Sequence, residues 1–190
     1  MSVRTITTIG DPVLRAPTAE LSPDELRSPE VQELIDDLVE TRRAAGGAGL
    51  AAPQVSVPLR VAVVEVDDHT RYAYKPPVAL TVIANPTIEP VSGDTLLINE
   101  GCLSVPDLRG DVQRFVHVRV RYLDRFGEPR SLIAEGLTAG TFQHETDHLD
   151  GILFVDRVAD PRSLSTWKQF ERHHQAEFLA RVAPYVRRIP

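Results

Sequence analysis

The sequence QHETDHLDG occupies residues 143–151 and carries two histidines four positions apart, with a glutamate directly after the first. In an α-helix, side chains at positions i and i+4 lie on the same face, so His144 and His148 can direct their ring nitrogens at one point. Glu145 then lies about 100° around the helix, where metal hydrolases with a His-Glu-x-x-His pattern carry their general base. The alternative is a polar helix face with two unrelated histidines. The spacing offers two metal ligands and a base, and leaves the third ligand undecided.

Cys102 is the best candidate for the third ligand. It is the single cysteine of the chain and lies in the segment NEGCLSVP (residues 99–106), at the end of a predicted strand. A catalytic metal usually has three protein ligands and one position for water. Free cysteines are also commonly buried in the core, so Cys102 alone is ambiguous. Together with the histidine pair, ligation is the better interpretation.

A third segment, GGAGLAAPQV (residues 46–55), combines small residues with an amide side chain. Small residues let the backbone approach a ligand closely, although a helix end followed by a loop has the same composition. The amide of Gln54 could donate a hydrogen bond to a developing oxyanion.

The rest of the sequence predicts an α+β fold with mostly antiparallel sheets around the metal-binding helix, in a single domain over residues 1–190. The clearest other helix, a scaffold helix, begins after a Ser28 cap and ends at Gly46 or Gly47, with its apolar residues on one face. Residues 67–79 are predicted as a long surface loop. Strands are predicted at residues 59–66, 80–88, 95–100 and 114–124, with a hairpin to 130–136, and a C-terminal helix at about 161–183.

Composition excludes several classes of protein. The formal net charge of −6 and pI near 5.5 lack the basic footprint that nucleic-acid binding requires. The N-terminal residues contain no apolar stretch typical of a signal peptide, and no span approaches a membrane helix. A lone cysteine fits a reducing compartment, so we expect a cytoplasmic protein.

Three motifs, taken together, resemble the peptide deformylase family. They are GAGLAAPQ at residues 47–54, EGCLS at 100–104 and QHETDHLDG at 143–151, in the family's order. The resemblance implies removal of the formyl group from the N-terminal formyl-methionine of new polypeptides, with release of formate. It also implies one metal ion per chain, Fe²⁺, with Ni²⁺, Co²⁺ or Zn²⁺ as substitutes, whereas the ligand chemistry alone suits zinc and iron alike.

By this resemblance, the metal ligands are Cys102, His144 and His148, with water in the fourth position. The metal-bound water attacks the formyl carbonyl, and Glu145 takes the water proton and passes it to the leaving amine. The oxyanion is held by Gln54 and the backbone N–H of Leu103.

Further roles follow by position in the family pattern. Substrate would pair in extended form with backbone groups of Ala48, Gly49 and Gly101. The ligands would be oriented by Glu100, Asp147 and Arg114. The methionine pocket would be formed by Ala48, Leu137, Gly140 and Thr141, and it is expected to be roomy because most of these residues are small. The expected partners are formyl-methionyl nascent chains, with the ribosome exit region as a candidate meeting place.

The sequence departs from the family pattern in two places, and two alternative functions remain open. Arg42 and Arg43 stand where an apolar residue is common in the family, and the 67–79 loop is longer than in compact members. A zinc peptidase would take its third ligand downstream, from Asp156, Glu171, His173, His174 or Glu177. A non-catalytic, metal-stabilised binding module would not need Glu145.

Overall fold

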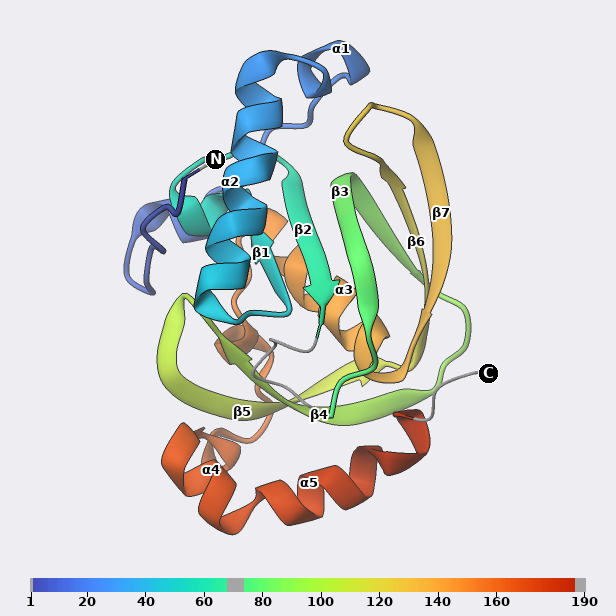
Figure 1. The fold of residues 1–190 in the computed structure, drawn as a ribbon. Helices are drawn as coiled ribbons and strands as arrows, with labels where there is room; N and C mark the ends of the chain where they lie inside the picture. The colour runs from blue at the N-terminus through green and yellow to red at the C-terminus, as the bar shows by residue number, and fades with distance from the viewer. Residues whose placement is uncertain (1, 68–73, 187–190) are drawn as a thin grey trace.

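The computed structural model describes residues 2–67 and 74–186, which form two antiparallel sheets with helices packed on them (Figure 1). The larger sheet has the order β1 (Gly49–Ala51), β2 (Val61–Val66), β3 (Val78–Pro90), β6 (His117–Leu123) and β7 (Pro129–Glu135). The smaller sheet has the order β4 (Thr95–Cys102), β5 (Val105–Phe115) and β8 (Ser165–Thr166). The α-helices are α1 (Pro23–Leu26), α2 (Pro29–Ala45), α3 (Gly136–Leu149), α4 (Trp167–His173) and α5 (Gln175–Val182). Short 3-10 helices connect them: η1 (Pro12–Arg15), η2 (Ala52–Val55), η3 (Phe154–Arg157), η4 (Pro161–Ser163) and η5 (Ala183–Tyr185). The predicted α+β fold is confirmed.

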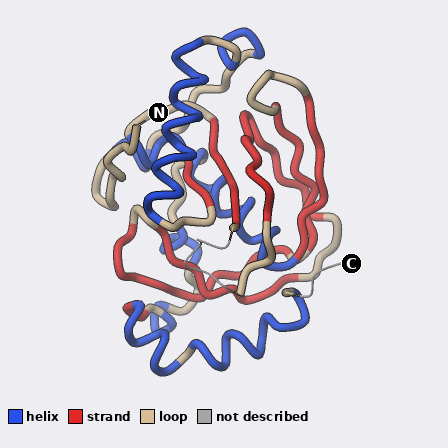
Figure 2. The backbone as a smooth tube through the Cα atoms, viewed as in Figure 1, coloured by secondary structure: helices blue, strands red, loops and turns tan. Residues whose placement is uncertain are grey.

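Strand β2 is covered by a helix on each face, which explains its almost unbroken apolar sequence. Val61 and Val63 pack into a cluster with the buried face of α2. Ala62 and Val64 point the other way, into a cluster with α3. Strands that are buried on both faces read as continuous apolar runs instead of alternating ones. Figure 2 shows these helices on opposite sides of the five-stranded sheet.

Helix α2 begins and ends where the sequence predicts. The Ser28 side chain accepts a hydrogen bond from the Val31 backbone, and Pro29 occupies the first turn. Gly46 ends the helix in the left-handed region, with φ of 64°, a conformation that glycine adopts without strain. The predicted apolar face of this scaffold helix is buried, and it comprises Val31, Leu34, Ile35, Leu38 and Val39.

Helix α3 lies between the two sheets and carries the QHETDHLDG motif. Its residues are buried except for Thr138 and His144, which are partly exposed. The helix ends at Leu149, and Gly151 then adopts φ of 71°, where a Cβ would stand 2.7 Å from the backbone oxygen of Arg15. Since polar side chains in such a helix are removed from water, they need partners within the protein.

The structure differs from the sequence prediction in four elements. Residues 105–115 form β5, a strand that the prediction missed, so the predicted strand at 114–124 is divided between the end of β5 and β6. Residues 49–51 form the edge strand β1, where a small-residue loop was the alternative. The predicted tail helix is interrupted: β8, α4 and α5 replace it, with a break at His174. Of the predicted 67–79 loop, residues 68–73 lie outside the described part and residues 78–79 belong to β3.

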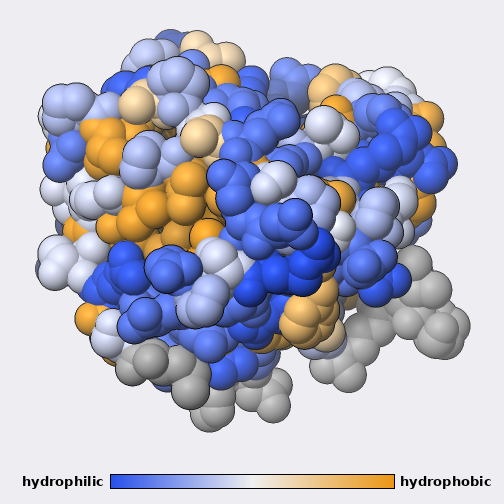
Figure 3. Space-filling model, turned by 90° about the horizontal axis from the view of Figure 1, so that it is seen from above, coloured by the Kyte–Doolittle hydropathy of each residue, from blue (hydrophilic) through white to orange (hydrophobic). Residues whose placement is uncertain are grey.

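The C-terminal helices cover the outer side of the smaller sheet. Phe170 of α4 and Phe178 of α5 form an apolar cluster with Leu96 and Ile98 of β4. Figure 1 shows α4 and α5 beneath β4 and β5. The face seen from above is mostly hydrophilic, with its largest apolar area left of centre and smaller apolar areas elsewhere (Figure 3). Within the described ranges, no helix has the length and apolar character needed to cross a membrane.

Candidate active site

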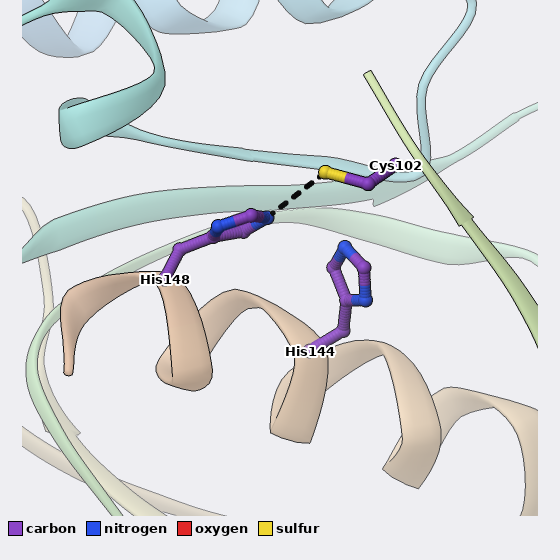
Figure 4. A group of neighbouring side chains, drawn as sticks. All are labelled: Cys102, His144 and His148. Carbon is purple, nitrogen blue, oxygen red and sulfur yellow. Dashed lines mark hydrogen bonds between the residues drawn. The ribbon is translucent and has the colours of Figure 1, made fainter. Parts of the chain in front are cut away.

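The fold brings Cys102, His144 and His148 together. Cys102 ends β4, whereas both histidines project from one face of α3 (Figure 4). The sulfur and the ligand nitrogens of the three residues lie within 4.8 Å of one another, and Cys102 Sγ is 3.2 Å from His148 Nε2. The cluster predicted from the sequence therefore exists as a group of converging donor atoms.

The three donors fit a metal ion in chemistry and in spacing. Bonds of about 2.0–2.3 Å to a tetrahedral ion place its donors about 3.3–3.6 Å apart, close to the 3.2 Å between the cysteine sulfur and His148. Thiolate and imidazole donors suit zinc and ferrous iron alike. A closed structural site usually has four protein ligands, and in the described part of the chain this group of potential ligands has three members. Such a set leaves a coordination position for water or substrate.

A buried ion-pair network orients His144. Its Nδ1–H donates to Glu100 at 2.8 Å, which leaves Nε2 to face the site. Arg114 donates to both oxygens of Glu100, at 2.7 and 3.0 Å, and to Asp147 at 2.6 Å. Arg157 completes the network with two further bonds to Asp147. Glu100 thus contacts the metal ligand His144 directly, whereas Asp147 acts on His144 through Arg114 and Glu100.

The network and the burial set the charges of these groups. Burial acts to raise the pKa of Glu100, but Arg114 and the His144 hydrogen bond outweigh it and hold the pKa well below its ordinary value. Burial acts to lower the pKa of His144, yet hydrogen bonds to Cys102 and Glu100 raise it well above its ordinary value. Burial and the neighbouring His144 lower the pKa of His148. Glu100 is therefore a carboxylate, the form that best holds a ligating imidazole in place.

Glu145 is buried and lies close to the backbone of β1. It lines the same pocket as Cys102 and His144. A Cβ atom on Gly49 would stand 2.3 Å from Glu145 Oε1, so only a glycine leaves room for this carboxyl. Burial raises the pKa of Glu145 to about 7, against the opposing effects of His144 and Lys75. Its Oε2 accepts no hydrogen bond from the described residues. A carboxyl with a pKa near neutrality is suited to accept and return a proton.

Gln54 is fixed beside Cys102 by its own hydrogen bonds. Its Oε1 accepts from the Ala51 backbone at 2.8 Å, and its Nε2 donates to Ser104 Oγ at 3.1 Å. Nε2 also lies 3.6 Å from Cys102 Sγ. The amide N–H groups are therefore held next to the ligand cluster, where an oxyanion donor is useful. Ser104, which the sequence prediction did not single out, helps to set this orientation.

Arg42 holds the glycine-rich segment in place through a hydrogen bond to its backbone. It is 1% exposed and donates to the backbone oxygens of Gly47 and Glu65, each at 2.9 Å. It also forms ion pairs with the carboxylates of Glu65 and Asp67. The arginine that replaces the family's common apolar residue is thus paired, as a buried charge must be.

A pocket of about 610 Å³, open to solvent, lies in front of the ligand cluster. Its lining includes the predicted substrate and oxyanion residues Ala48, Gly49, Gln54, Gly101, Leu103, Leu137, Gly140 and Thr141. The lining also includes residues that no motif indicated: Tyr74, Lys75, Ile98, Asn99, Arg109 and Phe178. Since β1 is the edge of its sheet and lines the pocket, an extended peptide could pair with it there.

The downstream residues that a zinc peptidase would use lie elsewhere. Asp156 pairs with Arg15, and His174 and Glu177 line a separate depression beside α5. Among the described residues, the potential ligand group of three consists of Cys102 and the two α3 histidines. The geometry favours the upstream cysteine as the third ligand.

Sequence comparison relates this chain to proteins of known family. The sequence model of the family described as polypeptide deformylase matches residues 3–163. A peptide deformylase of Leptospira biflexa is 43% identical over 159 residues, covering 83% of this chain and 89% of that protein. Peptide deformylase 1A, chloroplastic, of Solanum lycopersicum is 41% identical over 166 residues, but this chain spans only 60% of its length.

Solved structures agree with the sequence comparisons. A class I type b peptide deformylase from Acinetobacter baumannii, in a structure described as Met-ala-ser bound, superimposes with a TM-score of 0.79 at 40% identity. The match covers 83% of this chain and 100% of that one. With a family match over most of its length, this chain belongs to the polypeptide deformylase family and is a hydrolase of that class.

Proposed function

We propose that this protein removes the formyl group from the N-terminal formyl-methionine of new polypeptides and releases formate. The observation that carries the proposal is the buried Glu145, which lines one pocket with Cys102 and His144, two of the three converging donors. The Acinetobacter relative was solved with Met-ala-ser bound, a tripeptide that corresponds to a deformylated product. We place the reaction in the bacterial-type cytoplasm, with the ribosome exit region as the site where nascent chains are met.

The metal ligands, Glu145, Gln54 and Leu103 have distinct roles in the proposed mechanism. A divalent ion held by Cys102, His144 and His148 supplies Lewis acidity and lowers the pKa of water near it. Glu145 accepts a proton from the attacking water and returns it to the amine that leaves. Gln54 Nε2–H and the Leu103 backbone N–H donate to the oxygen of the formyl group as negative charge develops on it.

The substrate backbone would lie along β1. In this position, an extended peptide adds a strand at the free edge of the larger sheet, with main-chain hydrogen bonds to Ala48 and Gly49 and contact with Gly101. The side chain of the first residue then enters the part of the pocket lined by Leu137 and Thr141.

The direct test is formate release from formyl-Met-Ala-Ser by protein purified without oxygen, with the metal content measured on the same sample. We expect formate in proportion to bound metal and none after chelation. A parallel assay with an unformylated peptide tests the peptidase alternative. Cleavage of its internal bonds without formate release from the formylated peptide would overturn the proposal.

Replacing Gly49 with alanine should reduce turnover strongly without loss of metal. The new Cβ would stand 2.3 Å from Glu145 Oε1 and must displace that carboxyl. Because general acid–base catalysis contributes about 10²–10⁴-fold, we expect at least a tenfold loss of kcat. The matched control is Gly93→Ala, since Gly93 has no neighbour within 4 Å of a built Cβ. Equal kcat in the two variants would contradict the packing of Glu145 against β1.

If the native ion is Fe²⁺, the enzyme should lose activity in air faster without a reductant than with one. Cys102 is partly exposed, and its thiolate beside a redox-active ion is open to oxidation. We expect a reductant to slow the decay of activity, and a Ni²⁺-loaded control to decay slowly in both conditions. Equal decay of the iron form with and without reductant would count against Fe²⁺.

A further inference from the structure

One wall of the pocket carries a partly buried lysine that none of the motifs predicts. Lys75 donates from Nζ to Thr141 Oγ1 at 2.7 Å, one helical turn before Glu145 on α3. Its neighbour Tyr74 packs edge-on against the ring of Phe178 in α5, with 5.4 Å between ring centroids. These four residues come from three separate parts of the chain, and Tyr74, Lys75, Thr141 and Phe178 all line the pocket.

Another wall of the pocket is apolar. Ile98 and Leu137 line it, together with the small Ala48. Gly140 does not leave an empty recess, because a Cβ at that position would stand 2.6 Å from Ile98 Cδ1. The terminal methyl of Ile98 therefore occupies the space above the glycine. The pocket therefore combines this apolar wall with polar groups on its other side, among them Lys75, Thr141, Asn99 and Arg109.

The amino group of Lys75 is held among charged neighbours. Burial lowers its pKa to about 8, while Glu100 and Glu145 act to raise it and Arg109 to lower it. The group is therefore largely an ammonium ion at neutral pH. An apolar ligand placed against this partly buried cation removes water from it without replacing the lost hydrogen bonds, which is unfavourable. A ligand oxygen gives a charge-assisted hydrogen bond instead.

We propose that Lys75 and Thr141 form hydrogen bonds with the first side chain of the substrate. These bonds extend the substrate class to formyl-peptides that begin with methionine sulfoxide. This inference rests on the proposed deformylase function. The sulfoxide keeps the length of methionine and adds one strong acceptor oxygen at the sulfur, in the part of the side chain that enters the pocket. Oxidation of methionine to this form is a common lesion, so the substrate can arise from ordinary formyl-methionyl chains.

The test compares three tripeptides that differ only in the first side chain: formyl-methionine sulfoxide, formyl-methionine and formyl-norleucine, each followed by Ala-Ser. Norleucine has the shape of methionine without an acceptor. For the wild-type enzyme we expect kcat/KM for the sulfoxide to exceed that for norleucine at least about tenfold, because a site that donates to its ligand discriminates against an analogue without the acceptor.

Lys75→Met should remove this preference. We expect the sulfoxide-to-norleucine ratio of kcat/KM to fall at least tenfold, mainly through KM for the sulfoxide, because the lysine contacts the side chain and not the reacting carbonyl. Thr141→Val should reduce the same ratio in the same direction, and it provides a second variant if Lys75→Met folds poorly. The chain has two lysines, so Lys168→Met, at an exposed position on α4, is the matched control with an unchanged ratio.

The outcomes separate the two proposals. Wild-type, metal-loaded enzyme that releases formate from none of the three peptides would overturn the proposed function itself. Wild-type enzyme that releases formate but prefers norleucine to the sulfoxide would overturn only the role of the lysine. The role of the lysine would also be overturned by an active Lys75→Met variant whose sulfoxide-to-norleucine ratio of kcat/KM stays within twofold of the wild-type ratio.

Discussion

Replacing Glu145 with glutamine is expected to lower kcat for formyl-Met-Ala-Ser by about a hundredfold or more, the scale that a general base contributes. Glutamine has the size of glutamate and fits against Gly49, but it cannot take a proton. Glu145 lies outside the ligand group formed by Cys102, His144 and His148. The metal content should therefore stay at the wild-type value while turnover is lost.

The measurement is kcat together with metal analysis of the same preparation. Glu171→Gln, at an exposed position on α4, is the control for the same chemical change and should retain normal kcat. Near-normal turnover in Glu145→Gln would falsify the assignment of the base. A parallel loss of metal and activity would instead point to a role in holding the site together.

Replacing Arg114 with methionine should be the most destabilising single change in the site. Arg114 is 3% exposed and pairs with two buried carboxylates, Glu100 and Asp147. Removing one partner of a buried ion pair leaves uncompensated charge, which typically costs about 3–5 kcal/mol of unfolding free energy. His144 would also lose its fixed acceptor geometry, since the guanidinium holds Glu100 in place.

Denaturant unfolding of the metal-loaded proteins measures this effect. Arg121→Met is the matched control because Arg121 pairs with Glu89 at the surface, where both side chains are about half exposed. An exposed pair of this kind contributes about 0–1 kcal/mol. If the two variants lose the same free energy of unfolding, the buried network does not stabilise the protein in the way described.

The helices that frame the site could be predicted because their signals are local. The Ser28 cap and the Gly46 stop gave α2 its bounds, and the His-Glu-x-x-His spacing placed α3 correctly. Strand β5 could not be predicted in this way. Its sequence VPDLRGDVQRF buries Arg109 and Arg114, so its charged residues face partners elsewhere in the fold and not water. A pattern of apolar alternation does not contain that information.

The site was predictable where chemistry is concentrated in short motifs. The Cys102 and histidine donors converge, and Gln54 lies beside them. The wall that contains Tyr74, Lys75 and Phe178 was not predictable, because Tyr74 and Phe178 meet only where α5 docks on the smaller sheet. Position 75 lay in a segment without periodicity, and its partner Thr141 had no motif to indicate a donor nearby.

The ligand group also joins two layers of the fold. Cys102 ends a strand of the smaller sheet, whereas both histidines belong to a helix that packs beneath the larger one. An ion held by all three is a reversible cross-link between these layers. By thermodynamic linkage, a ligand that binds only the native state adds to stability, by about 4 kcal/mol at a free concentration a thousandfold above Kd. Metal supply would therefore set how long the protein remains folded in the cell, in addition to its catalytic rate.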